Sequence, residues 1–144
     1  MTLIRSELIG FGHYLPAKVL TNDDMAQMVD TNDEWISTRT GIKSRHVAAE
    51  NEFTSDISLV AARNALKSAG IQAEDLDMII VATVTTDETT PSTAAKISGK
   101  LGTKPGTIAT DISAACSGFV YAMTMADNMI RLGQIKTAMV IGAE

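Results

Sequence analysis

The sequence has one cysteine, few aromatic residues and no cluster of basic residues, and each shortage narrows the possible functions. With Cys116 alone the chain cannot form an internal disulfide, which suits a reducing, cytoplasmic environment. A net charge of −5 without a basic cluster gives no electrostatic footprint for nucleic acid. The sequence also lacks a signal-peptide-like apolar region and any apolar run of about 18 residues. We therefore expect a soluble protein that binds neither nucleic acid nor a membrane.

What the sequence does contain is an alternation of apolar runs with helical patterns. Hydrophobic residues make up 45% of the chain, which is enough for a core in a domain of this length. The apolar runs predict strands at residues 3–11, 42–47, 78–84, 108–112 and 137–142. Strands that alternate with helices predict an α/β fold with a mostly parallel sheet, in one domain that spans residues 1–144.

Helix start and stop signals lie between these strands. Thr54 and Gly70 bound one predicted helix, and Asn22 is the predicted N-cap of another. Thr90 is a predicted N-cap with Pro91 in the first turn. The full set of predicted helices covers residues 22–29, 31–38, 54–70, 90–102 and 116–133.

Cys116 stands where a predicted strand meets a predicted helix, after the small residues 113–115. The unpaired N–H groups and the positive dipole end of a helix stabilise a thiolate there. Such positions lower a cysteine pKa from about 8.5 to roughly 3.5–7.5. The order of strand, tight turn and helix is that of a nucleophile elbow. The alternative is an inert cysteine of the core, and no histidine in this stretch supplies a base.

Thr31, Trp35 and Arg39 recur every four positions, so the predicted helix would carry them on one face. An aromatic plane and a guanidinium can clamp an adenine ring, with contacts worth about 0.5–2 kcal/mol. The alternative for Trp35 is a packing role in the core. His13 and His46 have no second ligand at metal-binding spacing, so we predict no metal site.

Two separated stretches resemble a known family. Residues 111–122, with Leu132, Gly133 and the terminal segment 140–144, resemble the active-cysteine region of β-ketoacyl-acyl-carrier-protein synthase III. Residues 22–25 and 29–42, with Arg45 and His46, resemble the N-terminal segment of that family. The resemblance covers residues 4–144 and implies a thiolase-like layered αβαβα architecture. Residues 1–144 would then be the N-terminal half, which carries the nucleophilic cysteine.

The resemblance also implies roles for single residues. Cys116 would attack an acyl-coenzyme A to form an acyl-cysteine, which then condenses with malonyl-acyl carrier protein. The residues that match Thr31, Trp35 and Arg39 contact the nucleotide end of coenzyme A in the family. Thr90 occupies a position, often Phe, that reaches into the acyl pocket of the partner in a homodimer. Because Thr is smaller, we expect primers longer than acetyl to be tolerated. Coenzyme A thioester would be a substrate, and no cofactor would be bound permanently.

The histidine and asparagine that stabilise the enolate in the family belong to its C-terminal half, which this sequence lacks. We therefore expect a fragment of a longer enzyme that is not fully active alone and whose uncovered apolar faces favour self-association. Two other classes stay open. One is a related acyltransferase that makes polyketide or quinolone starter units. The other is a non-catalytic module for dimerisation or carrier docking, in which Cys116 is unreactive.

Overall fold

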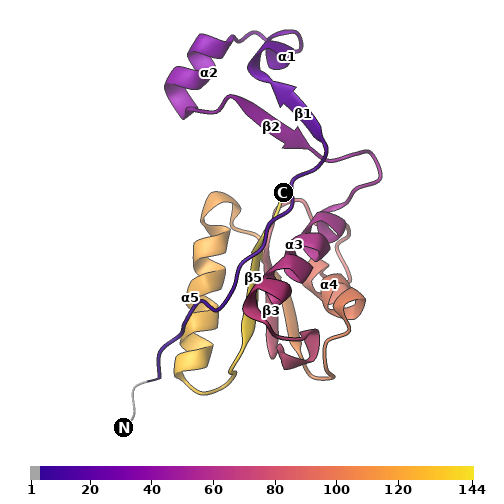
Figure 1. Ribbon diagram of the computed structural model, residues 1–144, viewed down its shortest axis with the longest axis vertical. Coiled ribbons are helices and arrows are strands. Elements are labelled where there is room, and N and C mark those ends of the chain that lie inside the picture. Colours follow the sequence, from indigo (N-terminus) through magenta and orange to yellow (C-terminus); the bar gives the residue numbers. More distant parts are fainter. Residues whose placement is uncertain (1–3) are drawn as a thin grey trace. The chain divides into compact units, whose positions relative to one another are not determined.

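The computed structural model describes residues 4–144 (Figure 1). These residues form two compact units. The larger unit consists of the residues up to Tyr14 together with residues 53–144, and the smaller unit consists of residues 15–52. Each unit has a β-sheet of its own.

The larger unit is built on a parallel sheet with the strand order β4-β3-β5. The strands are β3 (Met78–Ala82), β4 (Ile108–Ile112) and β5 (Ala138–Gly142), and β3 pairs in parallel with both neighbours. Every residue of β3 is buried, because β3 is the central strand and both of its faces are covered. The predicted parallel strands are therefore present, but full burial is confirmed only for β3, because no residue of β4 is buried and β5 is buried only in part.

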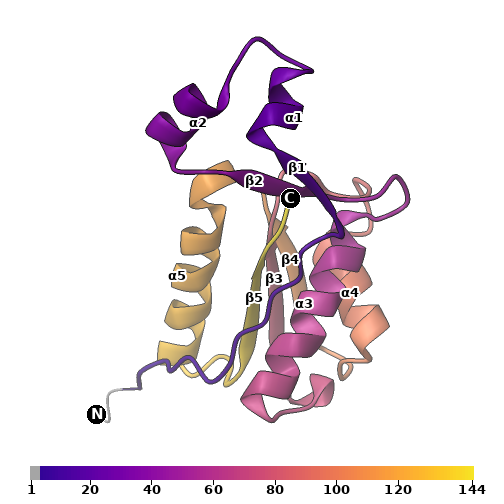
Figure 2. The ribbon, with the colours of Figure 1, turned by 45° about the horizontal axis from the view of Figure 1, so that its top comes forward.

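Helices cover both faces of this sheet, as Figure 2 shows. Helices α3 (Thr54–Ala69) and α4 (Thr93–Leu101) pack on the face that carries Ile79 and Val81. Helix α5 (Gly118–Arg131) packs on the opposite face, against Met78, Ile80 and Ala82. Ile79, Ile80 and Val81 are fully buried, and burial of such a side chain stabilises the fold by about 1.5–3 kcal/mol.

The start of α4 differs from the prediction. Thr90 is not its N-cap, because the helix begins at Thr93 and the side chain of Ser92 accepts the N–H of Ala95. Pro91 therefore precedes the helix, joined to Thr90 by a cis peptide bond. The predicted stop of α3 is confirmed, since Gly70 adopts a left-handed conformation with φ of 69°. A short 3₁₀ turn, η1 (Ala73–Asp75), leads from α3 toward β3.

The strand predicted at residues 3–11 is wrong for the part that the structure describes, and Leu3 lies outside the described residues. Residues 4–11 form no strand. This segment lies against α3, where a Cβ added to Gly10 would come within 2.6 Å of the backbone nitrogen of Ala69. Gly10 thus allows the segment to approach the helix closely, which a residue with a side chain would prevent.

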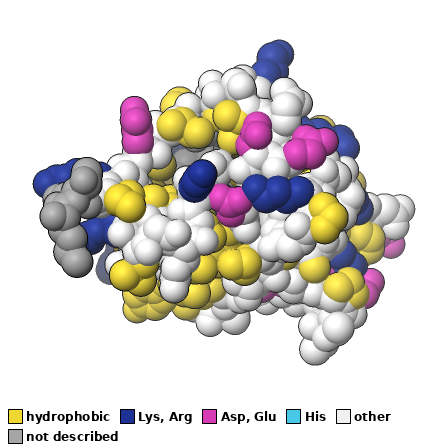
Figure 3. Space-filling model, turned by 90° about the horizontal axis from the view of Figure 1, so that it is seen from below, with side chains coloured by type: hydrophobic (Ala, Val, Ile, Leu, Met, Phe, Trp, Pro, Cys, Tyr) yellow, Lys and Arg dark blue, Asp and Glu magenta, His cyan; other side chains and the backbone are white. Residues whose placement is uncertain are grey.

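Asp77 joins the three strands at their amino ends. Its carboxylate accepts the N–H groups of Lys136 and Thr137, at 2.7 and 3.1 Å, and pairs with Lys104. These bonds, with that of Lys104 first, lower the pKa of Asp77 to about 2. In the view from below, several acidic side chains lie next to basic ones, and hydrophobic groups lie around them (Figure 3).

The smaller unit contains a two-stranded antiparallel sheet and two short helices. Strand β1 (Lys18–Thr21) pairs with β2 (Ser44–Val47), and the helices are α1 (Asn22–Ala26) and α2 (Asp33–Thr40). The prediction at residues 42–47 is confirmed as β2, whereas β1 was not predicted. Asn22 is not an N-cap, because Thr21 caps α1 and accepts the N–H of Asp24.

Candidate functional site

Cys116 lies at the junction of strand and helix that the sequence predicts. Strand β4 ends at Ile112, and Cys116 is the middle residue of a 3₁₀ turn, η2 (Ala115–Ser117). Helix α5 begins at Gly118, two residues later than predicted. The thiol belongs to an exposed residue, so the structure does not seal it in the core.

The backbone around Cys116 has two unusual features. Ala115 has a φ of 44°, and it is the only non-glycine residue of the described chain in the left-handed region. Gly118 is buried, and a Cβ there would lie 3.2 Å from the Cβ of Ala82 at the end of β3. The start of α5 thus approaches β3 closely and fixes the position of the turn that carries Cys116.

The side chain of Ser117 does not cap α5, because its hydroxyl donates to the carbonyl of Ala114 at 3.0 Å. The N–H groups in the first turn of a helix have no partner within that helix. Together with the helix dipole, they favour negative charge near Cys116. An exposed thiol beside such a helix end is suited to nucleophilic attack on a carbonyl, whose oxygen becomes negative.

Trp35 and Arg39 form a pair on α2. The side chain of Asn32 caps this helix by accepting the N–H of Trp35 at 2.8 Å. The guanidinium carbon of Arg39 lies 5.8 Å from the centroid of the Trp35 ring, and 57% of Trp35 is exposed. The expected combination of an aromatic plane and a guanidinium is therefore present and accessible within the smaller unit.

Thr31 does not lie on the same helical face as these two residues. Helix α2 runs over Asp33–Thr40, two residues later at each end than predicted, and Thr31 precedes its N-cap. The reason is local: Asn32 is extended, with φ of −154°, because it caps the helix with its side chain. A spacing of four residues does not define a face across such a cap.

Thr90 is exposed in residues 83–92, the segment that joins β3 to α4. The start of α4 is bound to Asp111 of β4, whose carboxylate accepts the N–H groups of Thr93 and Ala94 at 2.7 and 2.8 Å. Asp111 stands five positions before Cys116 in the sequence. One carboxylate thus connects the strand that leads to Cys116 with the helix that follows Thr90, a connection that the sequence analysis missed.

A second group that the sequence analysis missed is the hydrogen-bonded centre of the smaller unit. The side chain of Asn22 is 1% exposed and donates to Asp33 at 2.7 Å and to the carbonyl of Ile42 at 2.8 Å. Its oxygen accepts from Arg45 at 2.7 Å. Hydrogen bonds from Asn22, Ser37 and Lys43 lower the pKa of Asp33. We call Asn22, Asp33, Arg45 and the Ile42 carbonyl the Asn22 centre.

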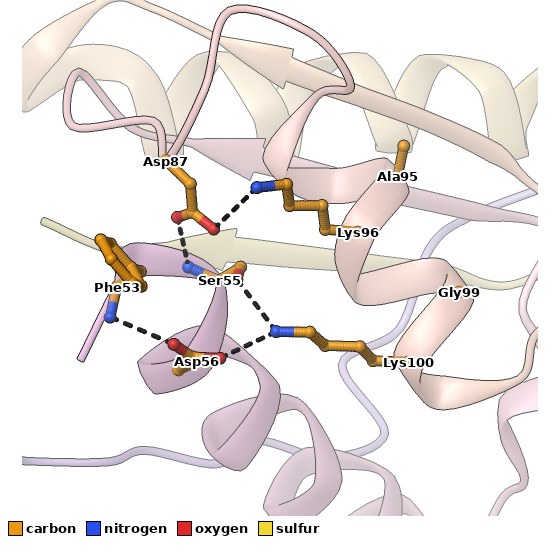
Figure 4. A pocket seen from close by; sticks show the side chains of 8 residues that line it. All are labelled: Phe53, Ser55, Asp56, Asp87, Ala95, Lys96, Gly99 and Lys100. Atoms are coloured by element: carbon orange, nitrogen blue, oxygen red, sulfur yellow. Dashed lines mark hydrogen bonds and ion pairs between the residues drawn. The ribbon is translucent and has the colours of Figure 1, made fainter. Parts of the chain in front are cut away.

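A cavity of about 480 Å³ lies between the start of α3 and α4 (Figure 4). Its charged groups are paired with one another: Lys96 with Asp87, and Lys100 with Asp56. None of the candidate site residues Cys116, Thr31, Trp35, Arg39 and Thr90 lines it. The lining residues are Phe53, Ser55, Asp56, Asp87, Ala95, Lys96, Gly99 and Lys100.

Within residues 4–144, no group of His, Cys, Asp and Glu side chains is arranged to hold a metal ion. The ring of His46 contacts the carbonyl of Pro16 at 2.6 Å, inside the smaller unit. No helix in the described part of the chain has the length and apolar character needed to cross a bilayer.

The layered sheet and the turn that presents a cysteine at the start of a helix are those of the thiolase family. Residues 36–144 match the model of the thiolase N-terminal domain, and the chain belongs to this family. Over 98% of its length it is 56% identical to the β-ketoacyl-[acyl-carrier-protein] synthase III of Rhodospirillum centenum, of which it covers 43%. The thiolase-like fold and the resemblance inferred from the sequence are thereby confirmed.

Solved structures give the same result. The 3-oxoacyl-[acyl-carrier-protein] synthase III from Aquifex aeolicus VF5 superposes with a TM-score of 0.89 and 48% identity, covering 99% of this chain and 45% of its own. The priming β-ketosynthase of the R1128 polyketide pathway superposes with a TM-score of 0.89 and 31% identity, covering 99% of this chain and 43% of its own. The chain spans less than half the length of these relatives.

Proposed function

We propose that the protein containing this chain is an initiating condensing enzyme of fatty acid synthesis, which joins an acyl-coenzyme A primer to malonyl-acyl carrier protein. The observation that carries this proposal is the exposed Cys116 in the turn before α5. It occurs in a chain that is 56% identical, over 98% of its length, to a relative with that name.

In the first half-reaction, the thiolate of Cys116 attacks the thioester carbonyl of acyl-coenzyme A. The new bond joins Sγ to the acyl carbon, the bond from that carbon to the coenzyme A sulfur breaks, and coenzyme A leaves as a thiolate that takes up a proton. The backbone N–H of Cys116 is proposed as one oxyanion donor, and loss of one such donor costs about 2.7–4 kcal/mol.

In the second half-reaction, the malonyl group loses CO₂ and its carbanion attacks the acyl-cysteine carbonyl. The bond from the acyl carbon to Sγ breaks, and the thiolate of Cys116 is regenerated. The sequence has no histidine after His46. Because the chain covers only 43% of its relative, the groups that stabilise the carbanion are proposed to lie outside residues 1–144, so the chain alone would acylate but not condense.

For coenzyme A, we propose that Trp35 and Arg39 together clamp the adenine ring at the nucleotide end. Their exposed pairing, at 5.8 Å, supports this role. Thr31 is proposed as a nearby polar contact from the chain just before the helix cap. Coenzyme A thioester would be a substrate, with no cofactor bound permanently.

We further propose that the enzyme is a cytoplasmic homodimer and that Thr90 borders the acyl pocket. The exposed position of Thr90 in the 83–92 segment is compatible with contact to a second copy. Because Thr fills less space than Phe, primers longer than acetyl are expected to react.

The full-length protein that carries this sequence, incubated with acetyl-coenzyme A and malonyl-acyl carrier protein, tests the proposal. We expect a 3-oxoacyl product and, without the malonyl substrate, a mass increase of one acetyl group on Cys116. Cys116→Ala removes both, while circular dichroism shows that the variant is folded. Product formation that Cys116→Ala leaves unchanged contradicts the proposal.

The second candidate is a starter-unit acyltransferase of polyketide synthesis. The specific observation in its favour is the priming β-ketosynthase, whose structure superposes as well as that of the Aquifex aeolicus synthase. A carrier-protein screen separates the two functions: transfer to a polyketide carrier in preference to a fatty acid carrier supports the second.

A further inference from the structure

The 83–92 segment between β3 and α4 is fixed at both ends by carboxylates of other elements. At its start, Glu144 accepts the N–H of Val84 at 3.1 Å and the hydroxyl of Thr85 at 3.0 Å. At its end, Asp111 binds the first N–H groups of α4. The segment has no regular secondary structure, so its conformation depends on such side-chain bonds.

The middle of the segment is held by Asp87. One carboxylate oxygen accepts the N–H of Ser55, in the first turn of α3, at 2.9 Å, and the other lies 3.4 Å from the ammonium group of Lys96 on α4. Lys96 also pairs with Glu88, at 2.8 Å. Figure 4 shows Asp87 between the two helices, with bonds to both.

The side chain of Asp87 is only 7% exposed, so water has little access to its carboxylate. Burial raises the pKa of Asp87, but the hydrogen bonds from Ser55 and Lys96 outweigh burial, and the net shift is downward. The group is therefore charged at neutral pH. A charged, mostly enclosed anchor that bonds to both helices restricts the segment more strongly than a solvated ion pair would.

We propose that Asp87 is a positioning residue that holds the 83–92 segment, and with it Thr90, in one conformation and so sets which acyl chains the enzyme accepts. This proposal rests on the proposed function, because it assigns Thr90 to the acyl pocket. Asp87 acts from three positions away and touches no substrate. Its removal loosens the segment, and the pocket then discriminates less between short and long acyl chains.

The test compares the acylation rate of Cys116 with acetyl-, butyryl-, hexanoyl- and octanoyl-coenzyme A in the full-length protein, together with hydrogen exchange of residues 83–92. Asp87→Ala is expected to change the octanoyl-to-acetyl preference by about fivefold or more and to speed exchange in the segment. Asp87→Asn keeps an acceptor for the Ser55 N–H, and we expect it to restore part of the wild-type preference.

Asp77→Asn is the matched control. Asp77 also accepts backbone N–H groups and pairs with a lysine, but it does so at the amino ends of the strands. It should lower stability without changing the acyl-chain preference.

The outcomes separate the two proposals. If Asp87→Ala lowers all acylation rates by the same factor, or if Asp77→Asn shifts the preference equally, the role of Asp87 is overturned while the proposed function stands. If no acyl-coenzyme A acylates the wild-type protein, the proposed function fails and the role of Asp87 fails with it.

Discussion

Each of the two units is stabilised internally by a different kind of interaction. In the larger unit the centre is apolar, with Ile79, Ile80 and Val81 fully buried in the parallel sheet. In the smaller unit the most buried side chain is that of Asn22, and α2 buries no residue at all. The larger unit carries Cys116, and the smaller unit carries the Trp35–Arg39 pair.

The difference follows from size. A short segment cannot bury enough apolar surface to offset the entropy lost on folding, so its stability must come from other interactions. In the Asn22 centre, the side chain of Asn22 makes hydrogen bonds to three partners in defined directions. Hydrogen bonds are directional and apolar contacts are not, so the polar centre specifies one geometry for the residues around it.

The largest effect is expected from Ile80→Ala in the larger unit. The substitution leaves a cavity in a fully buried strand and should lower the free energy of unfolding by about 2–5 kcal/mol. Denaturant titration followed by circular dichroism measures this loss. Val120→Ala, at an exposed position on α5, is the control and should stay within about 0.5 kcal/mol. If Ile80→Ala lowered the free energy of unfolding by less than Val120→Ala, burial of apolar side chains would not be what stabilises this unit.

Asn22→Ala should act on the smaller unit alone. It removes the hydrogen bonds that the buried Asn22 side chain makes with Asp33, Arg45 and the Ile42 carbonyl, at a cost of about 1–3 kcal/mol. Hydrogen exchange should rise in α2 and β2 and stay unchanged in β3. Asn51→Ala, at an exposed turn, serves as the control. Equal loss of protection in β3 would show that the two units are not stabilised separately.

Acid should weaken the larger unit through Asp77. Because the pKa of Asp77 in the folded chain is lowered to about 2, its stabilising contribution is complete above the unfolded value of 3.8. The contribution is then lost as pH falls toward 2, and we expect on the order of 1–2 kcal/mol. Unfolding free energies measured between pH 5 and pH 2 should fall less steeply in Asp77→Asn. Identical pH profiles would exclude this role of Asp77.

The smallest effect is expected from Trp35→Ala, which removes the exposed ring from the surface of the smaller unit. Loss of an exposed stacking or cation–π contact should weaken coenzyme A binding by about 0.5–2 kcal/mol, measured by calorimetry with the full-length protein. Trp35→Phe should retain part of the affinity. Stability should change little, since Trp35 is mostly exposed. Unchanged binding in Trp35→Ala would remove the support for a nucleotide site on α2.

The sequence was most informative where one local pattern decides the structure. Strand β3 is determined by its own apolar run, and the turn that carries Cys116 is determined by the small residues before it. The positions of both were therefore predicted within two residues. Asn22 was misassigned because its partners lie 11 to 23 positions away, and a capping rule considers only the next three. Residues 4–11 look like a strand because the pattern records alternation but not whether a neighbouring strand is available.

The same limit applies to the site. Cys116 could be found from the order of strand, turn and helix, whereas Asp87 and Asp111 could not be assigned. Their partners, Ser55, Lys96 and the first amides of α4, are 9 to 32 residues distant. In the sequence both are single acidic residues near an expected loop or strand end, with no signal that distinguishes an anchor from a solvated side chain.

The left-handed conformation of Ala115 has a consequence for engineering of the nucleophile. An L-residue with a side chain pays a conformational penalty of about 1–2 kcal/mol at such a backbone angle, and glycine does not. Ala115→Gly would remove that conformational penalty, but it would also make the backbone immediately before Cys116 more flexible. A substitution at Ala115 can thus change both the reactivity of the thiol and the rigidity with which it is held, without any change to Cys116 itself.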